Sequence, residues 1–189
     1  MISSKIRFLD IFISLIMLTI FFPIMLIISF FLLVIDGRPI IYKQVRVGYK
    51  GKKFVIFKFR TMKQFYKKDE ELRLTYFGKI LRKSSLDELP QLFNVLIKDM
   101  SMVGPRPLPQ GIEKKIRNSH KFKRREILPG ITGMSQINYT GKKRKLDEKI
   151  NLDMKFIDNY SVYNYFYILL KTPIVLIYRF FKNKSSIIK

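Results

Sequence analysis

The sequence predicts a mostly helical α+β protein with two parts, an N-terminal membrane segment (residues 1–36) and a membrane-associated domain (residues 37–189). Three observations lead to this prediction. Residues 11–35 contain no charged side chain, residues 39–61 are rich in β-branched and aromatic side chains, and much of the remainder has the apolar spacing of helices. With 189 residues, the chain has room for one domain and a small additional segment.

Composition restricts both the partners and the chemistry. Lys and Arg number 37 against 14 Asp and Glu, for a net charge of +23, while 48% of the residues are hydrophobic. A chain that is both basic and apolar suits an anionic membrane surface or nucleic acid. The sequence has no cysteine and one histidine, His120. This excludes disulfides, thiolate metal sites and multi-histidine sites, so polar catalysis must use carboxylates, Lys, Arg, Ser, Thr or Tyr.

Residues 11–35 are long enough to cross a bilayer core, which takes about 20 apolar residues. Lys5 and Arg7 precede this run and Arg38 follows it, so basic residues flank both ends. Basic residues favour the cytoplasmic side, and Pro23 removes a helical hydrogen bond. A re-entrant hairpin with both ends cytoplasmic is therefore one prediction. A single kinked span is the other, and residue chemistry alone favours neither.

The domain is predicted to combine one strand pair with several short helices. A capping box of Ser84 or Ser85 with Glu88 is predicted to begin a central helix. In the tail, Thr172 and Pro173 are predicted to begin the second of two short helices, which are either interfacial or ordinary core helices. The other predictions are a strand pair over residues 39–61 with its turn at 48–52, a connector at 63–71, helices over 72–83, 86–97, 112–127 and 146–159, a loop at 129–133, a short strand at 134–138 and a basic run at 142–145.

One acidic pair has apolar neighbours and is the candidate catalytic pair. Asp87 and Glu88 lie in the string SLDELPQLF, residues 85–93, whereas the other adjacent acidic residues lie among lysines. Two carboxylates in the first turn of a helix have an ordinary role, since they interact favourably with the helix dipole. They could instead attack phosphorus, accept a proton or share Mg²⁺, with Arg82 and Arg106 binding phosphate oxygens.

Several strings, in order along nearly the whole chain, resemble the bacterial sugar transferase family, the small monotopic phosphoglycosyl transferases. The combination of the Asp-Glu and Pro-Arg-Pro strings is highly specific. The sequence departs from the family's pattern at Phe22, where Ser is frequent, at one extra residue near Tyr139, and at Pro173. The matching strings are the apolar segment with Pro23, FKFRTM at 57–62, SLDELPQLFNV at 85–95, DMSMVGPRP at 99–107, PGITG at 129–133, LD at 152–153 and LLKT at 169–172.

The resemblance implies a re-entrant helix-break-helix in the membrane and a small cytosolic α/β catalytic domain with amphipathic interfacial helices. The protein would lie at the cytoplasmic face of the bacterial inner membrane, as a monotopic protein. The resemblance also implies transfer of a sugar-1-phosphate from a UDP-sugar to polyprenyl (undecaprenyl) phosphate, with release of UMP and a requirement for Mg²⁺. Such a reaction starts the assembly of capsules, O-antigens or glycoproteins.

The family's pattern also implies a role for each matching residue. Asp87 would be the nucleophile of a covalent, ping-pong reaction, and Glu88 would be its acid/base or metal partner, with both carboxylates at the Mg²⁺ site. Arg106 and Arg82 would bind phosphate. Asp153 could also be a buried salt-bridge partner. The further site residues that the resemblance implies are Lys58, Arg60, Asp153 and Gln136.

The expected partners are a UDP-sugar, polyprenyl phosphate and membrane lipid, and no nucleic acid. A homo-oligomer and contacts with downstream glycosyltransferases are further options. The main alternative is a membrane-tethered nucleic-acid-binding protein, whose basic and aromatic side chains would contact phosphates and stack on bases. A third option is a non-catalytic scaffold of a glycan-assembly complex.

Overall fold

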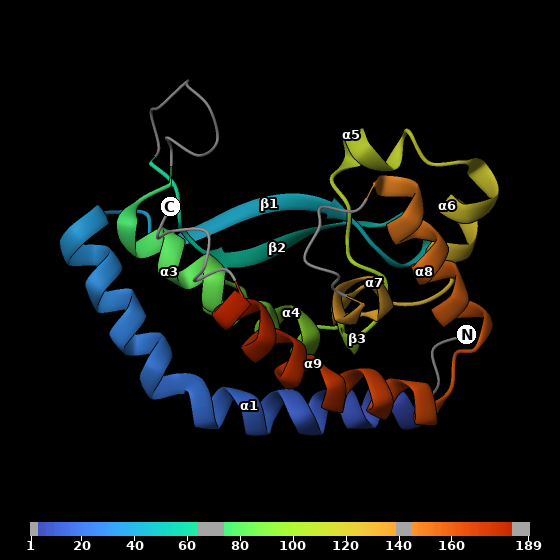
Figure 1. The fold of residues 1–189 in the computed structure, drawn as a ribbon, viewed down its shortest axis with the longest axis horizontal. Helices are drawn as coiled ribbons and strands as arrows, with labels where there is room; N and C mark the ends of the chain where they lie inside the picture. Colours follow the sequence, from blue (N-terminus) through green and yellow to red (C-terminus); the bar gives the residue numbers. More distant parts are fainter. Residues whose placement is uncertain (1–3, 64–73, 139–144, 183–189) are drawn as a thin grey trace.

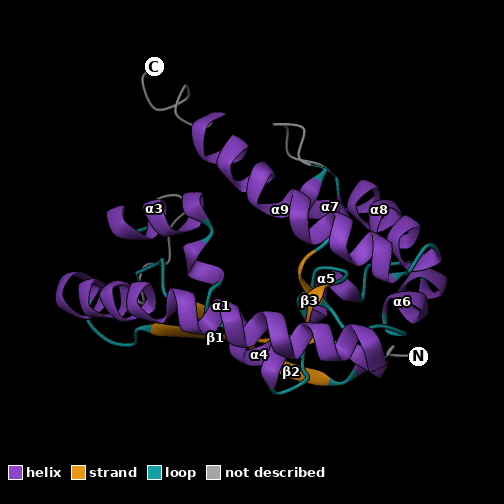
Figure 2. Cartoon of the chain, turned by 90° about the horizontal axis from the view of Figure 1, so that it is seen from below, coloured by secondary structure: helices purple, strands orange, loops and turns teal. Residues whose placement is uncertain are grey.

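The computed structural model describes residues 4–63, 74–138 and 145–182, and it confirms a mostly helical α+β fold. Helix α1 (Ser4–Phe31) continues into a π-helical turn (Leu32–Asp36) and runs along one side of the molecule (Figures 1 and 2). The strands β1 (Ile41–Val47) and β2 (Lys53–Phe59) form a long hairpin on the opposite side in Figure 1. The predicted connector at 63–71 and basic run at 142–145 lie almost wholly outside the described residues.

Helix α1 passes through Pro23 without a break, so the predicted helix-break-helix is wrong in that detail. Figure 1 shows instead a bent helix. A proline inside a helix removes one hydrogen bond and kinks the helix, and neighbouring residues can keep their helical backbone on both sides. The bend therefore replaces the break.

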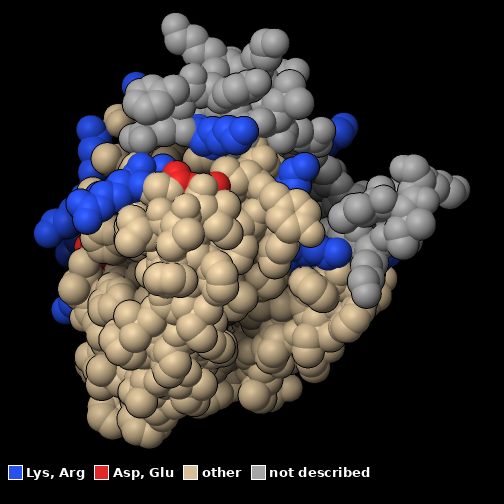
Figure 3. All heavy atoms as spheres, turned by 90° about the vertical axis from the view of Figure 1, so that its left-hand side faces the viewer, with Lys and Arg blue, Asp and Glu red and all other residues tan. Residues whose placement is uncertain are grey.

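Most of the surface of α1 faces away from the protein. In the described part of the chain, Ser4–Asp36 is the one helix long and apolar enough to cross a membrane, and 17% of its most apolar stretch is buried. A core helix of that length would be mostly buried. Figure 3 shows that Lys and Arg gather in the upper part of one face, while the lower part of that face is uncharged. The exposed apolar side chains of α1 include Phe12, Leu15, Ile20, Phe22, Leu26, Ile27 and Phe30.

The N-terminal half of α1 is fixed to the domain by buried polar contacts. Asp10 is fully buried, and its Oδ1 accepts hydrogen bonds from Ser101 Oγ at 2.8 Å and Tyr165 Oη at 2.9 Å. Arg7 Nη2 donates to the carbonyl of Val95 at 2.7 Å. A buried carboxylate needs such partners. The apolar helix is thus attached to the domain through Asp10, for which no role was predicted, and through Arg7, which was predicted only as a flanking basic residue.

The β1–β2 hairpin confirms the predicted strand pair and its turn, which forms a 3₁₀ turn at Tyr49–Gly51. In the antiparallel register, Tyr42 lies opposite Lys58. Directly opposed residues share a face of the sheet, and so do alternate residues of one strand. Tyr42, Gln44, Arg46 and Lys58 therefore lie on one face of the hairpin.

A second, smaller sheet was not predicted. Strands β3 (Ser101–Val103) and β4 (Gly130–Thr132) pair in parallel, and β4 lies where a loop was predicted at 129–133. The two backbone segments approach each other very closely: a Cβ placed on Gly130 would lie 2.0 Å from the backbone nitrogen of Gly104. Only glycine permits that approach, so the glycines that indicated a loop in fact allow the strands to pair.

Three predictions about helices need correction. The predicted strand at 134–138 is the helix α7, in which the backbone N–H of Ile137 donates to the carbonyl of Gly133 at 3.1 Å as in a helical turn. The single helix predicted at 112–127 is two short helices. Thr75 Oγ1 caps α3 by accepting from Gly78 N at 2.9 Å, so that helix begins later than predicted. The helix predicted at 146–159 is confirmed as α8. The bounds are α3 (Tyr76–Ser84), α5 (Gln110–Glu113), α6 (Asn118–Arg124), α7 (Met134–Ile137) and α8 (Leu146–Asp158).

The C-terminal tail is one helix, α9 (Val162–Lys182), with Pro173 inside it, so the prediction of two helices is wrong. Thr172 does not cap a second helix. Its Oγ1 donates to the carbonyl of Ile168 at 2.7 Å and lies 2.7 Å from Thr132 Oγ1 in β4. The helix buries Tyr165 and Ile168 and exposes Tyr163, Leu170, Ile174, Ile177, Tyr178 and Phe181.

Candidate active site

A cleft of about 1830 Å³ contains the carboxylate pair. This volume exceeds the roughly 300–1,000 Å³ of a usual small-molecule pocket, so the cleft has room for more than one ordinary ligand. Its lining combines charged and apolar groups. The charged residues include Lys58, Arg82, Asp87, Glu88 and Arg106, and the apolar ones include Ile13, Met17 and Phe21 of α1 and Leu169, Val175 and Leu176 of α9.

The turn that carries the pair is not the predicted capping box. Ser85 has a φ of 59°, in the left-handed region, and its side chain makes no capping hydrogen bond. Leu86–Glu88 then forms a single 3₁₀ turn before helix α4 (Gln91–Leu96). Because Ser85 lacks the extended backbone of a capping residue, the Glu88 side chain does not return to its backbone N–H. It extends instead toward two cationic side chains.

Glu88 is held by one cation from the hairpin and one from the loop after β3. Its Oε1 accepts from Lys58 Nζ at 2.6 Å and from Arg106 Nη2 at 2.7 Å. Burial alone would raise the pKa of Glu88, but Arg106 and Lys58 outweigh it and hold the pKa at about 2. At neutral pH Glu88 is therefore a fixed anion that has no proton to donate and is a weak base.

Asp87 has the opposite environment, although it is the adjacent residue. Its side chain is buried, and burial together with the charge of Glu88 raises its pKa to about 6, against the opposing charges of Lys58, Arg82 and Arg106. A carboxylate with this pKa is mostly ionised at pH 7 and weakly solvated. It is thus suited to attack an electrophile.

Arg82 lies on the Asp87 side of the site. Its Nε donates to Thr61 Oγ1 at 2.9 Å, and its charge lowers the pKa of Asp87. Helix α3 packs directly against the backbone at Thr61, and Gly78 permits this contact because a Cβ there would lie 2.2 Å from the Thr61 carbonyl oxygen. Arg82, one turn later in the helix, is thereby brought close to Thr61 and Asp87. Arg82 is therefore fixed by the packing of its helix.

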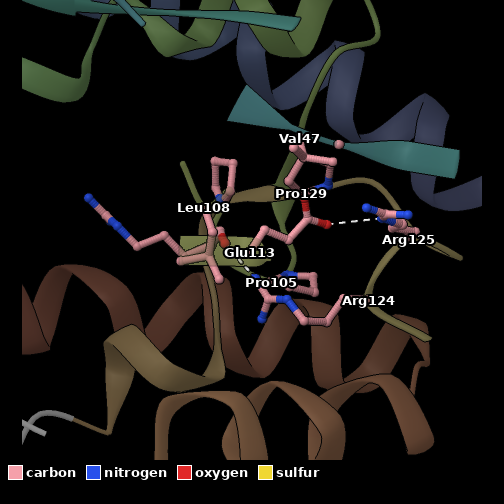
Figure 4. Close-up of a pocket in the computed structure, with 10 residues that line it drawn as sticks. Val47, Pro105, Leu108, Glu113, Arg124, Arg125 and Pro129 are labelled. Carbon is pink, nitrogen blue, oxygen red and sulfur yellow. Dashed lines mark hydrogen bonds and ion pairs between the residues drawn. The ribbon is translucent and has the colours of Figure 1, made fainter. Parts of the chain in front are cut away.

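The backbone of Arg106 is held in place by an arginine that belongs to a buried ion pair. The carbonyl of Arg106 accepts from Arg124 Nη2 at 2.7 Å, and Arg124 pairs with Asp153, which is buried. Figure 4 shows Arg124 beneath the turn, beside Pro105. Of the two options for Asp153, the structure shows the buried salt-bridge partner. The charges of Glu88, Asp87 and Asp153 raise the pKa of Arg106, so Asp153 also acts on the site electrostatically.

Two other predicted site residues line the cleft but make different contacts. Arg60 donates to the backbone carbonyls of Gly37 at 2.7 Å and Arg38 at 2.8 Å, so its guanidinium fixes the chain that leaves α1. Gln136 Nε2 donates to the carbonyl of Ile131 at 2.7 Å. The structure thus brings together Lys58, Arg82, Asp87, Glu88 and Arg106, with Arg60, Gln136 and Asp153 around them.

The described residues contain no group of three His, Cys, Asp or Glu side chains that could hold a metal ion. The pair itself has what Mg²⁺ commonly uses, one or two carboxylates completed by substrate phosphates. The charge of Glu88 raises the pKa of Asp87, so the two anions repel each other in a buried place. A divalent cation would relieve that repulsion. The residues present therefore fit Mg²⁺ bound together with a phosphorylated substrate.

Two cationic residues of this region, Arg46 and Arg124, were not predicted as site residues from the sequence. Arg46 lines the same cleft as the carboxylates. The alternation of the predicted strand placed it on the face of Lys58, which is the signal that could have found it. Nothing local in the sequence links Arg124 to Arg106.

The chain matches the family described as "Bacterial sugar transferase" over residues 3–179. The protein belongs to the bacterial sugar transferase family. It is 44% identical over 67% of its length to an uncharacterized sugar transferase, EpsL, of Bacillus subtilis, covering 64% of that protein. It is 35% identical over 94% of its length to the UDP-glucose:undecaprenyl-phosphate glucose-1-phosphate transferase of Klebsiella pneumoniae.

A third bacterial sugar transferase relative is the undecaprenyl-phosphate galactose phosphotransferase of Salmonella typhimurium, 35% identical over 76% of this chain. The chain spans 40% of the length of the Klebsiella protein and 34% of the Salmonella protein. The match to the family covers the hairpin, the carboxylate pair and most of α9.

Proposed function

We propose that this bacterial sugar transferase moves a sugar-1-phosphate from a UDP-sugar to polyprenyl phosphate and releases UMP. The observation that carries the proposal is the buried Asp87, with a pKa of about 6, among three cationic side chains in a cleft with apolar walls. The names of the Klebsiella and Salmonella relatives, which specify undecaprenyl phosphate, support the same class of acceptor.

The proposed reaction has two displacements at one phosphorus atom. An oxygen of Asp87 attacks the sugar-linked phosphorus, the bond to the bridging oxygen breaks, and UMP leaves with the electron pair. A phosphate oxygen of the lipid then attacks the same phosphorus, and the Asp87 carboxylate is regenerated. No proton transfer is required, because both the attacking and leaving oxygens are anionic phosphate or carboxylate oxygens.

The cationic side chains supply the electrostatics of these steps. The donor's diphosphate would repel a carboxylate, and Arg82 and Arg106 offset that repulsion by binding its oxygens. Glu88, ionised and held by Lys58, keeps Arg106 in place and is the second carboxylate for Mg²⁺. When bound, Mg²⁺ would supply further charge neutralisation on the diphosphate.

The apolar lining of the cleft suits the lipid acceptor. It comes from α1 and α9, the two helices with many exposed apolar side chains. We propose that both helices lie at the cytoplasmic face of the membrane. In this topology α1 enters the membrane, bends near Pro23 and returns to the same face. Cysteine-accessibility labelling tests this topology without background, since the chain has no native cysteine. Labelling of a Cys at position 3 from outside intact cells would contradict it.

The function is tested by UMP release from detergent-purified protein with polyprenyl phosphate, Mg²⁺ and a panel of UDP-sugars. The panel includes UDP-glucose and UDP-galactose, because the relatives are named for different sugars. We expect one donor to give UMP and a lipid-linked sugar, and chelation of Mg²⁺ to stop the reaction. Equal UMP release by the wild type and Asp87→Asn with every donor would contradict the proposal. Family membership gives no support to the nucleic-acid-binding alternative.

A further inference from the structure

Arg46 is a cationic residue of the cleft that has no part in the reaction described so far. It extends from β1 on the hairpin face shared with Tyr42 and Lys58, and it lines the cleft beside Glu88 and Arg106. Placement on a strand rather than a loop gives its side chain a well-defined origin.

The guanidinium of Arg46 is held by neutral groups. Its Nη1 donates to the carbonyl of Pro107 at 3.2 Å, next to Arg106, and its Nη2 donates to Gln44 Oε1 at 2.5 Å. Its Nε is buried without a hydrogen-bond partner among the described residues. Glu88 forms its ion pairs with Lys58 and Arg106, and no ion pair joins Arg46 to an acidic side chain among the described residues. The guanidinium of Arg46 therefore has no directly bonded anion in that part of the protein.

The electrostatic surroundings of Arg46 favour an anionic ligand at this position. Burial, followed by the charge of Arg106, lowers the pKa of Arg46, while Tyr42 and Glu88 act in the opposite direction. Two guanidinium groups that repel each other in a partly buried place are costly without an anion between them. Arginine binds phosphate oxygens with its planar fork, so a phosphate group suits this position.

The position of Arg46 relative to the proposed nucleophile indicates which of the donor's two phosphates it would bind. Arg82 is hydrogen-bonded to Thr61, just past the end of β2, whereas Glu88 is bonded to Lys58. Arg46 lies four residues along β1 from Tyr42, the residue opposite Lys58, and is therefore about 13 Å nearer the turn of the hairpin. Arg46 and Arg82 therefore lie on opposite sides of Lys58 along the hairpin. Resting on the proposed function, we propose that Arg46, positioned by Gln44, binds the nucleoside-linked phosphate of the donor, which leaves as UMP, while Arg82 serves the sugar-linked phosphate.

The test compares binding of UMP with binding of uridine, which lacks the phosphate. The protein is the full chain in detergent, and NMR measures both affinities. Arg46→Gln keeps a donor for the Pro107 carbonyl but removes the charge, so we expect UMP affinity to fall at least tenfold and uridine affinity to stay within twofold. Gln44→Ala should cause a smaller loss in the same direction. The KM for the UDP-sugar should rise with the UMP dissociation constant.

Arg117→Gln is the matched control, since Arg117 is an exposed arginine of the domain outside this cleft. It should leave both affinities unchanged. Equal weakening of UMP and uridine by Arg46→Gln would show a purely structural role, and unchanged UMP affinity would also overturn the inference. If Arg46→Gln does not fold, unchanged UMP affinity in Gln44→Ala decides against it. Failure of the wild type to release UMP from any donor would instead contradict the proposed function.

Discussion

The two sides of the carboxylate pair are built differently. On the α3 side, Arg82 is fixed to Thr61 and faces Asp87, whose pKa is raised to about 6. On the hairpin side, Lys58 and Arg106 both bind Glu88 and hold its pKa at about 2. The adjacent carboxyl groups of Asp87 and Glu88 therefore have very different pKa values. Asp87 is buried and has no ion pair among the described residues, whereas Glu88 is half-buried and bound by two cations.

This difference suggests a division of roles between the two sides. The α3 side presents a carboxylate with little direct pairing, which can bond to phosphorus. The hairpin side presents a preformed cationic surface whose charge is already in place before substrate binds, as electrostatic preorganisation requires. Variants on the two sides should therefore fail in different ways.

The largest effect is expected for the carboxylates themselves. Asp87→Asn keeps the shape but removes the nucleophile, so lipid-linked product should fall at least about 1,000-fold. Glu88→Gln weakens the contacts with Lys58 and Arg106 and removes one of the proposed Mg²⁺ ligands, so we expect a severe but incomplete loss. Steady-state UMP release measures both. Greater residual activity in Asp87→Asn than in Glu88→Gln would reverse the assignment of the two sides.

Arg106→Lys should have the next largest effect. Lysine keeps the charge but cannot bind Glu88 and a phosphate with the two prongs of a guanidinium. A charge-assisted hydrogen bond contributes about 1.5–3 kcal/mol, so the loss of kcat/KM should be roughly 10- to 100-fold. The exposed Arg117→Lys is its control. Near-normal turnover of Arg106→Lys would show that charge alone is needed at this position.

Asp153→Asn should have a moderate effect that passes through Arg124. The amide cannot balance the guanidinium of Arg124, which then holds the Arg106 carbonyl less firmly. We expect about a tenfold loss of kcat/KM, and a lower thermal unfolding midpoint because a buried charge loses its partner. Asp158→Asn is the matched control, since Asp158 pairs with Lys123 on the surface. Equal effects of the two variants would rule out support of Arg106 by Asp153.

The smallest effect is expected from pH near neutrality. Attack needs the ionised form of Asp87, whose pKa is raised to about 6, so the rate of UMP release should decrease as pH falls through about 6. Glu88, with a pKa of about 2, stays ionised over this range. Single-turnover UMP release between pH 5 and 8 measures the profile. A rate that is flat down to pH 5 would contradict the raised pKa of Asp87.

The sequence predicted those features that depend on neighbouring residues. Residues 39–61 are rich in β-branched and aromatic side chains and contain a turn at 48–52, which together specify a hairpin, and the strings around Asp87, Glu88 and Arg106 carry the family resemblance. The features that it did not predict depend on contacts between distant segments. Gly130 pairs in a strand because it meets Gly104.

Contacts between distant segments also explain two wrong predictions, the second helix in the C-terminal tail and the capping box before Asp87 and Glu88. Thr172 contacts Thr132 from inside a continuous helix rather than capping a new one. The left-handed backbone of Ser85 excludes the expected capping box, and Glu88 is bound instead by Lys58 from the hairpin and by Arg106. Local propensity cannot anticipate cations that arrive from other parts of the chain.

In the proposed mechanism, Asp87 carries the sugar-phosphate before any lipid binds. Intact-protein mass spectrometry after mixing with a UDP-sugar and Mg²⁺, in the absence of polyprenyl phosphate, detects this intermediate. We expect one equivalent of released UMP and a mass increase of one sugar-phosphate on the wild type, with neither in Asp87→Asn. An adduct that persists in Asp87→Asn, or UMP release that occurs only when the lipid is present, would contradict this mechanism.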